Sequence, residues 1–368
     1  MKERLQALQN FLQEQHIQGG LITSRHNIFY LSQFDYDPHE RFVGIFVFAN
    51  REPIFITPSM EVQMLKEAGW NKQIISYTDS DNPWSLVRDV IQGGNEINRF
   101  AVEKHAISYF YIENLQQILS GAEFVSLDDK LTEMRLVKDD NEVAILREAA
   151  AFADYGVKVG IETLNEGMTE LELLGKIEYE LKKKGIREMS FSTIVLFGQN
   201  ASNPHGISGE NKLKKGDPVL FDLGVKYKGY SSDITRTVFY DRVTSEFQTI
   251  YNTVLQANLA GLEACQAGSR IGDVDIAARN VIQAAGYGDF FPHRIGHGLG
   301  IDVHESPSMN DANDGILKPG MVLTVEPGIY VPGLGGIRIE DDLVITEKGC
   351  EVLTKFSKTM QVVKGDER

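Results

Sequence analysis

The chain contains little cysteine and no long apolar segment. Cys265 and Cys350 are the only thiols among 368 residues, which excludes a disulfide framework and a thiolate metal site. No window approaches the roughly 18 consecutive apolar residues of a membrane-spanning helix. The first residues, Met-Lys-Glu-Arg-Leu-Gln, are charged and amphipathic, unlike the apolar core of a signal peptide. We therefore expect a cytoplasmic protein, in a reducing compartment and without a membrane partner.

Basic residues are the minority among the charged side chains. Lys and Arg number 37 against 52 Asp and Glu, which leaves a formal net charge of -15 and an isoelectric point near 5.1. Phosphate backbones and anionic lipid surfaces select basic proteins, so we do not expect nucleic acid as a partner. The apolar content of 42% is ordinary for a globular protein, and 368 residues are too many for a single core. Length and composition therefore predict two domains.

Short strands and helices alternate in the first third of the chain. Leu5, Leu8 and Leu12 recur at helical spacing, and Gly19 with Gly20 then ends the helix. This alternation predicts an α/β domain over residues 1–130, with a charged connector near residues 128–138. The expected strands are residues 21–23, 43–48, 54–57, 74–77, 100–102 and 124–127, and the expected helices are residues 59–68, 84–92 and 107–119.

Residues 131–368 form a second predicted domain with an internal repeat. One helix begins after Asp139 or Asp140, and another begins at the capping box of Thr169 and Glu172. A strand, a loop that contains His205 and a hairpin at residues 219–238 follow. Two helices and a hairpin then recur, which predicts an α+β domain with a pseudo-twofold axis. The expected elements of this recurrence are helices at residues 245–266 and 273–285 and hairpin strands at residues 321–326 and 336–342.

Asp222 and Asp233 lie within the apolar strands of the first hairpin. Their β-branched and aromatic neighbours predict that both strands are buried. A turn over residues 226–229 would set Asp222 directly opposite Asp233, with the two Cβ atoms about 4.5 to 5.5 Å apart. Two buried carboxylates at that separation require a raised pKa or a bound cation. The alternative is a pair of solvated acids on an exposed strand.

Glu326 and Glu340 repeat this arrangement in the second hairpin, and His297 stands between the hairpins in a glycine-rich segment. Flanking glycines let a ligand approach a histidine closely, although His297 taken alone would more often be structural. Four acids and one histidine are a hard, oxygen-rich set that suits Mn²⁺ and can hold two divalent ions. Two ions about 3.5 to 4 Å apart lower the pKa of a water between them and polarise a carbonyl. The pattern predicts metal-dependent hydrolysis of an amide.

Five short motifs carry a family resemblance: Phe-Asp222-Leu-Gly, Ser-Asp233-Ile-Thr-Arg-Thr, Gly-His297-Gly-Leu-Gly, Val-Glu326-Pro-Gly and Arg338-Ile-Glu340-Asp. In this order they resemble the metallopeptidases of the pita-bread fold. The first 130 residues resemble the creatinase/prolidase-type N-terminal domain, so the likeness covers nearly the whole chain. The pattern is most similar to bacterial Xaa-Pro dipeptidase, or prolidase, with aminopeptidase P as a near relative. The resemblance implies a pita-bread catalytic domain over residues 131–368, a small peptide substrate, a homodimer, and two Mn²⁺ ions per subunit, with Co²⁺ or Zn²⁺ as alternatives.

The resemblance also implies a role for each predicted ligand. Asp222 would hold one ion, Asp233 and Glu340 would bridge both, and His297 and Glu326 would complete the other. A hydroxide between the ions would attack the carbonyl of the Xaa-Pro bond. Glu326 would pass a proton to the proline nitrogen.

Other residues are expected around the substrate. His205 and His304 match histidines of the family that donate hydrogen bonds to the substrate carbonyl, and His293 is expected behind them. Arg294 is the first candidate for binding the carboxylate of the proline. Arg338 is the second candidate, unless it orients the metal ligand on its own strand face instead.

In the N-terminal half, a polar loop at residues 37–41 contains His39 and Arg41, which could bind the charged end of a small substrate. The alternative is an ordinary surface turn with Pro38 at its bend. In dimers of the family, the N-terminal domain of one subunit approaches the cleft of the other. The loop would then close the pocket and restrict it to dipeptides.

Three alternatives to a dipeptidase stay open. Aminopeptidase P uses the same five ligands on longer Xaa-Pro peptides, but the short chain without a third domain and the loop near His39 favour the dipeptidase. A non-catalytic binding module on the same fold generally loses ligand residues. Creatinase shares both domains but lacks the ligand set, which is intact here.

Overall fold

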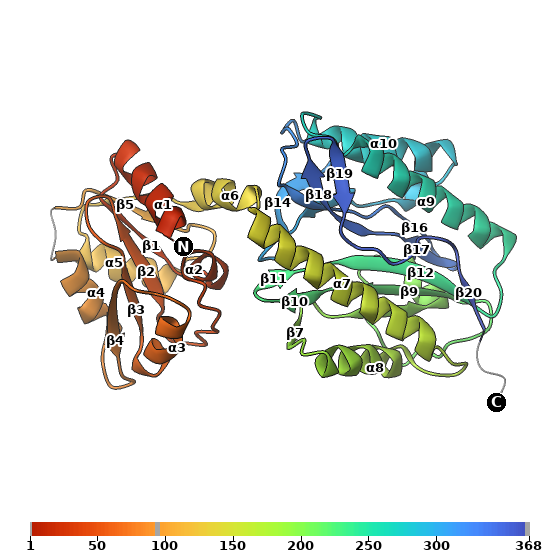
Figure 1. Cartoon of the computed structure of the whole chain (residues 1–368), viewed down its shortest axis with the longest axis horizontal. Coiled ribbons are helices and arrows are strands. Elements are labelled where there is room, and N and C mark those ends of the chain that lie inside the picture. Colours follow the sequence, from red (N-terminus) through yellow and green to blue (C-terminus); the bar gives the residue numbers. More distant parts are fainter. Residues whose placement is uncertain (1, 93–95, 365–368) are drawn as a thin grey trace. The chain divides into compact units, whose positions relative to one another are not determined.

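A six-stranded sheet forms the framework of the N-terminal unit, Met1–Arg135, in the computed structural model (Figure 1). The structure describes residues 2–92 and 96–364 of the chain. The strand order is β4-β3-β2-β1-β5-β6, with parallel and antiparallel neighbours. The strands are β1 (Gly19–Ile22), β2 (Gly44–Phe48), β3 (Ile54–Pro58), β4 (Gln73–Tyr77), β5 (Arg99–Val102) and β6 (Glu123–Ser126). The helices are α1 (Lys2–Glu14), α2 (Arg25–Ser32), α3 (Val62–Glu67), α4 (Pro83–Gln92), α5 (Tyr109–Ile118) and α6 (Asp128–Leu136), with a 3-10 turn at Ser59–Glu61.

The predicted strands of this unit are all present within two residues of their expected bounds, which confirms its α/β class. Two helices differ from the prediction. The sequence pattern misses α2 because its eight residues end in a continuously buried run, which carries no helical period. Its start is capped by the Ser24 hydroxyl, which accepts a hydrogen bond from the Asn27 amide. Helix α6 occupies most of the expected connector, and Leu131 is the buried residue of its weak apolar face.

The C-terminal unit, Leu136–Arg368, repeats one arrangement of helices and strands twice. Figure 1 shows α9 and α10 on one side of the strands of this unit and α8 on the opposite side. Helix α7 contacts the strands of the first half, and α9 contacts those of the second. Each half has its own apolar core, centred on residues such as Phe221 in the first and Leu323 in the second.

The bounds of the C-terminal elements follow the predicted order. The first half contains α7 (Asp140–Thr163), α8 (Glu170–Lys183), β7 (Glu188–Met189), β8 (Ile194–Phe197), η2 (Gly198–Ser202), β9 (Pro218–Leu223), β10 (Val225–Tyr227), β11 (Tyr230–Ser231) and β12 (Ile234–Tyr240). The second half contains α9 (Ser245–Ala264), α10 (Ile271–Ala284), η3 (Gly288–Phe290), β13 (Gly296–Gly298), β14 (Glu305–Met309), β15 (Val322–Val325), β16 (Gly328–Val331), β17 (Gly335–Arg338), β18 (Asp341–Thr346), β19 (Gly349–Val352) and β20 (Val362–Val363). The main sheets have the orders β20-β12-β9-β8 and β14-β13-β15-β18-β19.

The register of the first hairpin differs from the prediction. Asp222 lies opposite Thr235, so the expectation that it faces Asp233 directly is wrong. The turn is centred one residue later than expected, on Lys228 and Gly229, which both have positive φ angles of 48° and 83°. Such mirror-image two-residue turns match the twist of paired strands, but a lysine at the first position gives little signal of one. Asp233 therefore lies two residues nearer the turn than Thr235, which is the partner of Asp222.

The second hairpin has the predicted register. The pair Gly328 and Arg338 on one side, and the pair Val325 and Asp341 on the other, follow a single alignment about Gly333. Glu326 and Glu340 occupy the junction between these two ladders. The junction interrupts both strands, so the two acids sit where backbone pairing is broken.

Residues 354–363, here called the strap, run along the C-terminal unit and tie its parts together. The amides of Lys355 and Phe356 donate to the Asp154 carboxylate at 2.7 and 2.9 Å. The buried Arg236 donates to the Phe356 carbonyl from Nε at 3.1 Å and from Nη2 at 2.8 Å. Lys358 donates to Oδ2 of the buried Asp341 at 2.7 Å. The strap thus supplies both a carbonyl and a cation to charged groups that are buried beside the second hairpin.

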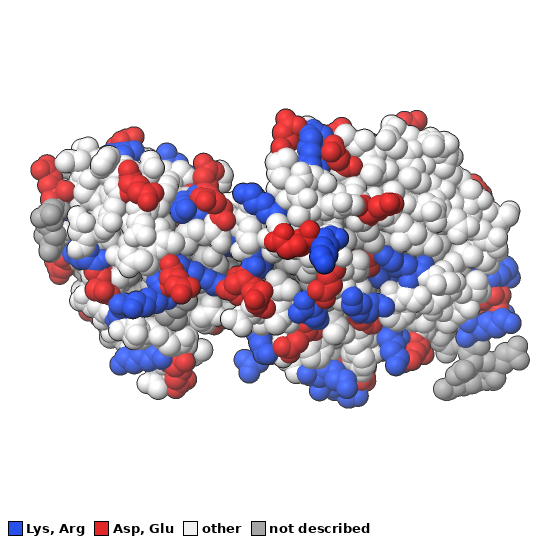
Figure 2. Space-filling view, turned by 45° about the horizontal axis from the view of Figure 1, so that its top comes forward, with Lys and Arg blue, Asp and Glu red and all other residues white. Residues whose placement is uncertain are grey.

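Charged side chains of both signs are interspersed on the surface. Figure 2 shows one face, on which Lys and Arg alternate with Asp and Glu without a continuous field of either sign. Across residues 2–92 and 96–364, each helix is too short or too polar to span a lipid bilayer.

Candidate metal centre

Ten of the predicted site residues line one pocket of about 390 Å³ in the C-terminal unit. Phe191, Ile194 and Pro204 complete the lining. The ten residues come from both hairpins, from β13 and from the loops before β9, β13 and β14. They are His205, Asp222, Asp233, His293, Arg294, His297, His304, Glu326, Arg338 and Glu340.

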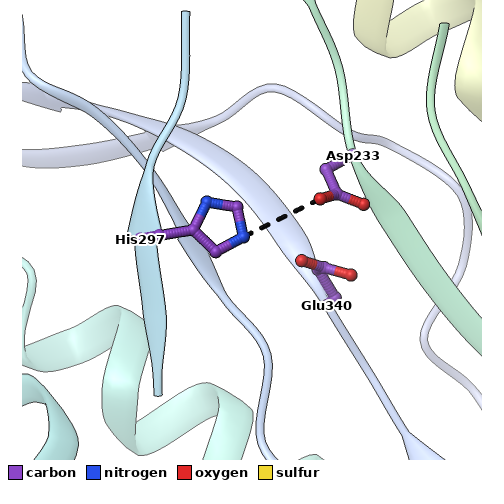
Figure 3. Close-up of side chains that lie close together, drawn as sticks. All are labelled: Asp233, His297 and Glu340. Atoms are coloured by element: carbon purple, nitrogen blue, oxygen red, sulfur yellow. Dashed lines mark ion pairs between the residues drawn. The ribbon is translucent and has the colours of Figure 1, made fainter. Parts of the chain in front are cut away.

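Asp233, His297 and Glu340 form the centre of this pocket, and Figure 3 shows their side chains converging from three strand segments. Each offers one ligand atom, and these atoms lie within 4.8 Å of one another. The His297 Nε2 atom is 3.9 Å from Asp233 Oδ2 and 3.5 Å from Glu326 Oε1. The side chains of Asp233, His297 and Glu340 are buried.

The backbone orients the His297 ring for metal binding. Its Nδ1 atom lies 3.1 Å from the Gly298 carbonyl oxygen, so we assign the ring proton to Nδ1. Burial lowers the pKa of His297 to about 3, which leaves the ring neutral. The lone pair on Nε2 then faces the carboxylates, which is the tautomer that a metal ligand requires.

The acids in the pocket repel one another in the absence of a cation. Burial raises the pKa of Asp233 well above its usual range, and the neighbouring Glu340 raises it further. Burial and the charge of Glu326 raise the pKa of Glu340 in the same way. Burial also raises the pKa of Glu326 to about 8. A shared positive charge would remove this penalty.

Two carboxylate oxygens in the pocket are buried without a hydrogen bond among the described atoms. Among the atoms that the structure describes, neither Asp222 Oδ1 nor Asp233 Oδ1 has a partner. A carboxylate oxygen in that position is costly unless it binds a donor or a cation. The unpaired oxygens, the neutral imidazole and the hard carboxylate set therefore fit divalent metal ions.

Arg338 holds the second oxygen of Asp222 and links the two hairpins. Its Nη2 atom donates to Asp222 Oδ2 at 2.5 Å, and its Nε atom donates to the Thr235 hydroxyl at 3.0 Å. The Thr235 hydroxyl in turn donates to Glu340 Oε2 at 2.7 Å. This geometry favours the second of the two roles considered for Arg338, orientation of metal ligands, although the ligand that it contacts directly is Asp222.

Tyr330 extends this network and was not among the predicted residues. Its hydroxyl accepts a hydrogen bond from Arg338 Nη1 at 2.7 Å and lies 3.0 Å from His293 Nε2. His293 Nδ1 lies 2.8 Å from the Arg294 carbonyl, so its proton belongs there and Nε2 accepts from the tyrosine. Burial lowers the pKa of His293 to about 4, which agrees with a neutral ring. The feature that could have identified Tyr330 is the register of the second hairpin. That register places Gly336 opposite Tyr330, and a glycine there leaves room for the ring.

His205 and His304 enter the pocket from exposed loops. Arg338 Nη1 donates to the carbonyl of Pro204, next to His205, at 3.3 Å. The His304 ring lies edge-on to the His297 ring, with centroids 4.3 Å apart, and burial lowers its pKa. The neighbouring Glu305 pairs with the buried Lys138 at 3.3 Å, which anchors the base of the loop.

His39 and Arg41 belong to the N-terminal unit. Arg41 makes a two-pronged ion pair with Asp79, from Nε at 2.9 Å and from Nη2 at 3.3 Å. His39 has a positive φ of 49° and its amide donates to the Asp37 carboxylate. The loop is therefore a tight turn, and its role in substrate binding stays a prediction.

Two family models match the chain. "Metallopeptidase family M24" matches residues 144–347, and "Creatinase/Prolidase N-terminal domain" matches residues 4–137. Among curated relatives, "Putative dipeptidase YkvY" of Bacillus subtilis (strain 168) is 52% identical over 361 residues, which are 98% of this chain and 99% of that protein.

Solved structures show the same architecture. The Xaa-Pro dipeptidase from Bacillus anthracis is 32% identical, with a TM-score of 0.91 over 99% of each chain. The X-Pro aminopeptidase from Thermotoga maritima MSB8 is 30% identical, with a TM-score of 0.87 over 95% of this chain and 98% of that one. The M24 model matches more than half of the chain, and the relative and both solved structures match nearly all of it. The protein therefore belongs to metallopeptidase family M24, as a peptidase with a creatinase/prolidase-type N-terminal domain.

Proposed function

We propose that the protein is an Xaa-Pro dipeptidase that uses two divalent metal ions to hydrolyse the bond before proline. The observation that carries this proposal is one pocket lined by all five predicted ligands, in which two buried aspartate oxygens lack a hydrogen bond among the described atoms. Relatives named as dipeptidases support the substrate class.

Asp222, Asp233, His297, Glu326 and Glu340 would together hold the two ions. Mn²⁺ is the expected metal because four of the five ligands are carboxylates, with Co²⁺ or Zn²⁺ as alternatives. When bound, such ions supply an activated water and polarise the carbonyl that it attacks.

The protein side chains bind the substrate and move its protons. An Xaa-Pro bond has no amide hydrogen, and the proline nitrogen must gain a proton as it leaves. Glu326 would accept a proton from the attacking water as a carboxylate and then deliver it to the proline nitrogen. His205 and His304 would donate hydrogen bonds to the carbonyl oxygen as negative charge develops on it. Arg294, which lines the pocket and donates from Nη1 to Ser308 at 3.0 Å, would bind the proline carboxylate.

Aminopeptidase P activity is the second candidate, because the chain is also similar to the aminopeptidase from Thermotoga maritima. We prefer the dipeptidase because the loop at residues 37–41 would block longer peptides in a homodimer. We also propose a cytoplasmic location, in keeping with the small number of cysteines.

The test begins with protein that has been stripped of metal and then restored with Mn²⁺, Co²⁺ or Zn²⁺. Metal-dependent release of proline from Leu-Pro but not from Leu-Pro-Gly supports the dipeptidase, whereas cleavage of the tripeptide alone supports aminopeptidase P. The variant Asp222→Asn should abolish hydrolysis with either substrate. Asp241→Asn, outside the pocket, is the matched control. Retained activity of Asp222→Asn would contradict the metal mechanism.

A further inference from the structure

Glu170, at the first position of α8, is fully buried and lies outside the group of residues that line the pocket. Its carboxylate receives two backbone hydrogen bonds, from the amide of Phe197 at 2.7 Å and from that of Gly209 at 2.8 Å. The Asn200 side chain donates to both oxygens at 3.0 Å, and the Asn211 side chain donates at 3.3 Å. Five hydrogen bonds therefore converge on one buried anion.

Three of the four donor residues belong to one loop, with Phe197 and Gly209 at its ends and Asn200 within it. Phe197 closes β8, Gly209 lies twelve positions further along, and His205 stands between them. Asn200 also donates to the carbonyl of Ile207 at 3.3 Å, so it joins Glu170 to the segment next to His205. Beneath that segment, a Cβ atom on Gly206 would lie 2.7 Å from Leu196, which shows how closely the loop packs.

The start of α8 does not need this carboxylate. Thr169 caps the helix, because its hydroxyl accepts from the Glu172 amide and the Glu172 carboxylate accepts from the Thr169 amide. Glu170 instead directs its charge away from the helix and into the loop. A buried anion is costly unless it is well paired, and here all of the described partners but one belong to residues 197–209.

We propose that Glu170 is a positioning residue for His205: it closes the loop at residues 197–209 and so sets where the imidazole enters the pocket. This inference rests on the proposed function, in which His205 donates to the substrate carbonyl. A displacement of about 1 Å in such a donor can cost a hundredfold in rate. The carboxylate acts through the loop and does not touch the substrate.

The first measurement is independent of activity. Histidine labelled with ¹³C gives signals for the eight imidazoles of the chain, and His205→Ala identifies that of His205. In Glu170→Gln the side-chain NH₂ group faces the N–H donors of the loop and cannot accept their hydrogen bonds. We therefore expect the His205 signal to move while that of His297 stays in place. An unmoved His205 signal would overturn the inference, whatever substrate the enzyme cleaves.

The second measurement is a double-mutant cycle on the metal-loaded enzyme with Leu-Pro. Glu170→Gln should lower kcat/KM by about tenfold to a hundredfold, and it should cause no further loss in the His205→Ala background. Mn²⁺ affinity, measured by titration, should stay within about twofold because no proposed ligand lies on the loop. Equal losses in both backgrounds would refute positioning through His205.

Two further variants keep the outcome interpretable. Glu172→Gln, two residues away on the same helix, should leave kcat/KM and the His205 signal unchanged. Asn200→Ala removes the same link from the partly exposed side of the loop, so it serves if Glu170→Gln does not fold. Wild-type enzyme without metal-dependent cleavage of Leu-Pro would refute the proposed function, while the labelled imidazole would still decide the role of Glu170.

Discussion

Removal of divalent metal should make the protein less stable as the pH rises from about 5 to about 8. Asp233, Glu326 and Glu340 have raised pKa values in the metal-free fold, whereas the unfolded chain titrates near the ordinary values. Below the pKa of the unfolded chain these carboxyl groups are protonated in both states, so the folded state loses no stability. Above it the unfolded chain releases protons that the folded chain retains, so stability falls until the folded pKa is passed.

Glu326 sets the scale of this effect. Burial raises its pKa from an ordinary value of 4.5 to about 8. At about 1.4 kcal/mol per unit, the loss is on the order of 5 kcal/mol for this group alone. A domain of roughly 150–250 residues changes its Tm by about 2 to 4 °C per kcal/mol. We therefore expect a decrease on the order of 10 to 20 °C across the interval.

The assay compares thermal unfolding of chelator-treated wild type and Glu326→Gln over this pH range. Glutamine does not titrate, so the variant should become more stable than the wild type by an increasing margin as the pH rises. Carboxylates outside the pocket titrate equally in both proteins and cancel in the difference. Glu340 and Asp233 lose the repulsion of Glu326 in the variant, which widens the margin in the same direction. Saturating Mn²⁺ should remove the decrease in the wild type. A difference between the two proteins that is the same at both ends of the range would refute the reasoning.

Three other predictions follow from the structure. Arg236→Met should lower the free energy of unfolding by about 3 to 5 kcal/mol, measured in urea, because it removes one of the two cations paired with the buried Asp341 carboxylate and the donor to the Phe356 carbonyl; Arg242→Met, on an exposed arginine, should have little effect. Tyr330→Phe should weaken Mn²⁺ binding about tenfold by calorimetry, since Arg338 loses one of the partners that hold it against Asp222; unchanged affinity would show that the other contacts suffice. Shortening the loop at residues 37–41 should raise the ratio of Leu-Pro-Gly to Leu-Pro cleavage in kinetic assays, and an unchanged ratio would count against its role.

The two-domain fold and the residues around the pocket were accessible from the sequence because they depend on local patterns. Alternating strands and helices, capping boxes and acids inside apolar strands are all visible without knowledge of tertiary contacts. The second hairpin shows this well, since its register about Gly333 follows from the turn residues. The metal-ligand roles of Asp222 and its companions stay predictions until a metal is measured.

Other features depend on contacts between distant residues and leave no local signal. The first hairpin pairs Asp222 with Thr235 because its turn takes Lys228 into a left-handed conformation, which the residue type does not indicate. Arg236 looks like an exposed strand residue in the sequence, yet its buried guanidinium joins Glu340 to the strap. Glu170 is likewise indistinguishable from a first-turn helix acid until the loop folds over it.

The strap also has a consequence for biosynthesis. Arg236 Nη1 donates to the Glu340 carbonyl at 2.5 Å, and the same guanidinium is held by the Phe356 carbonyl. Translation delivers the first 353 residues before this carbonyl and Lys358 emerge from the ribosome. The nascent chain can therefore complete its N-terminal unit and most of its sheets while the backbone around Glu340 still lacks its final support. We expect the growing polypeptide to stay inactive until residues 354–363 have been made.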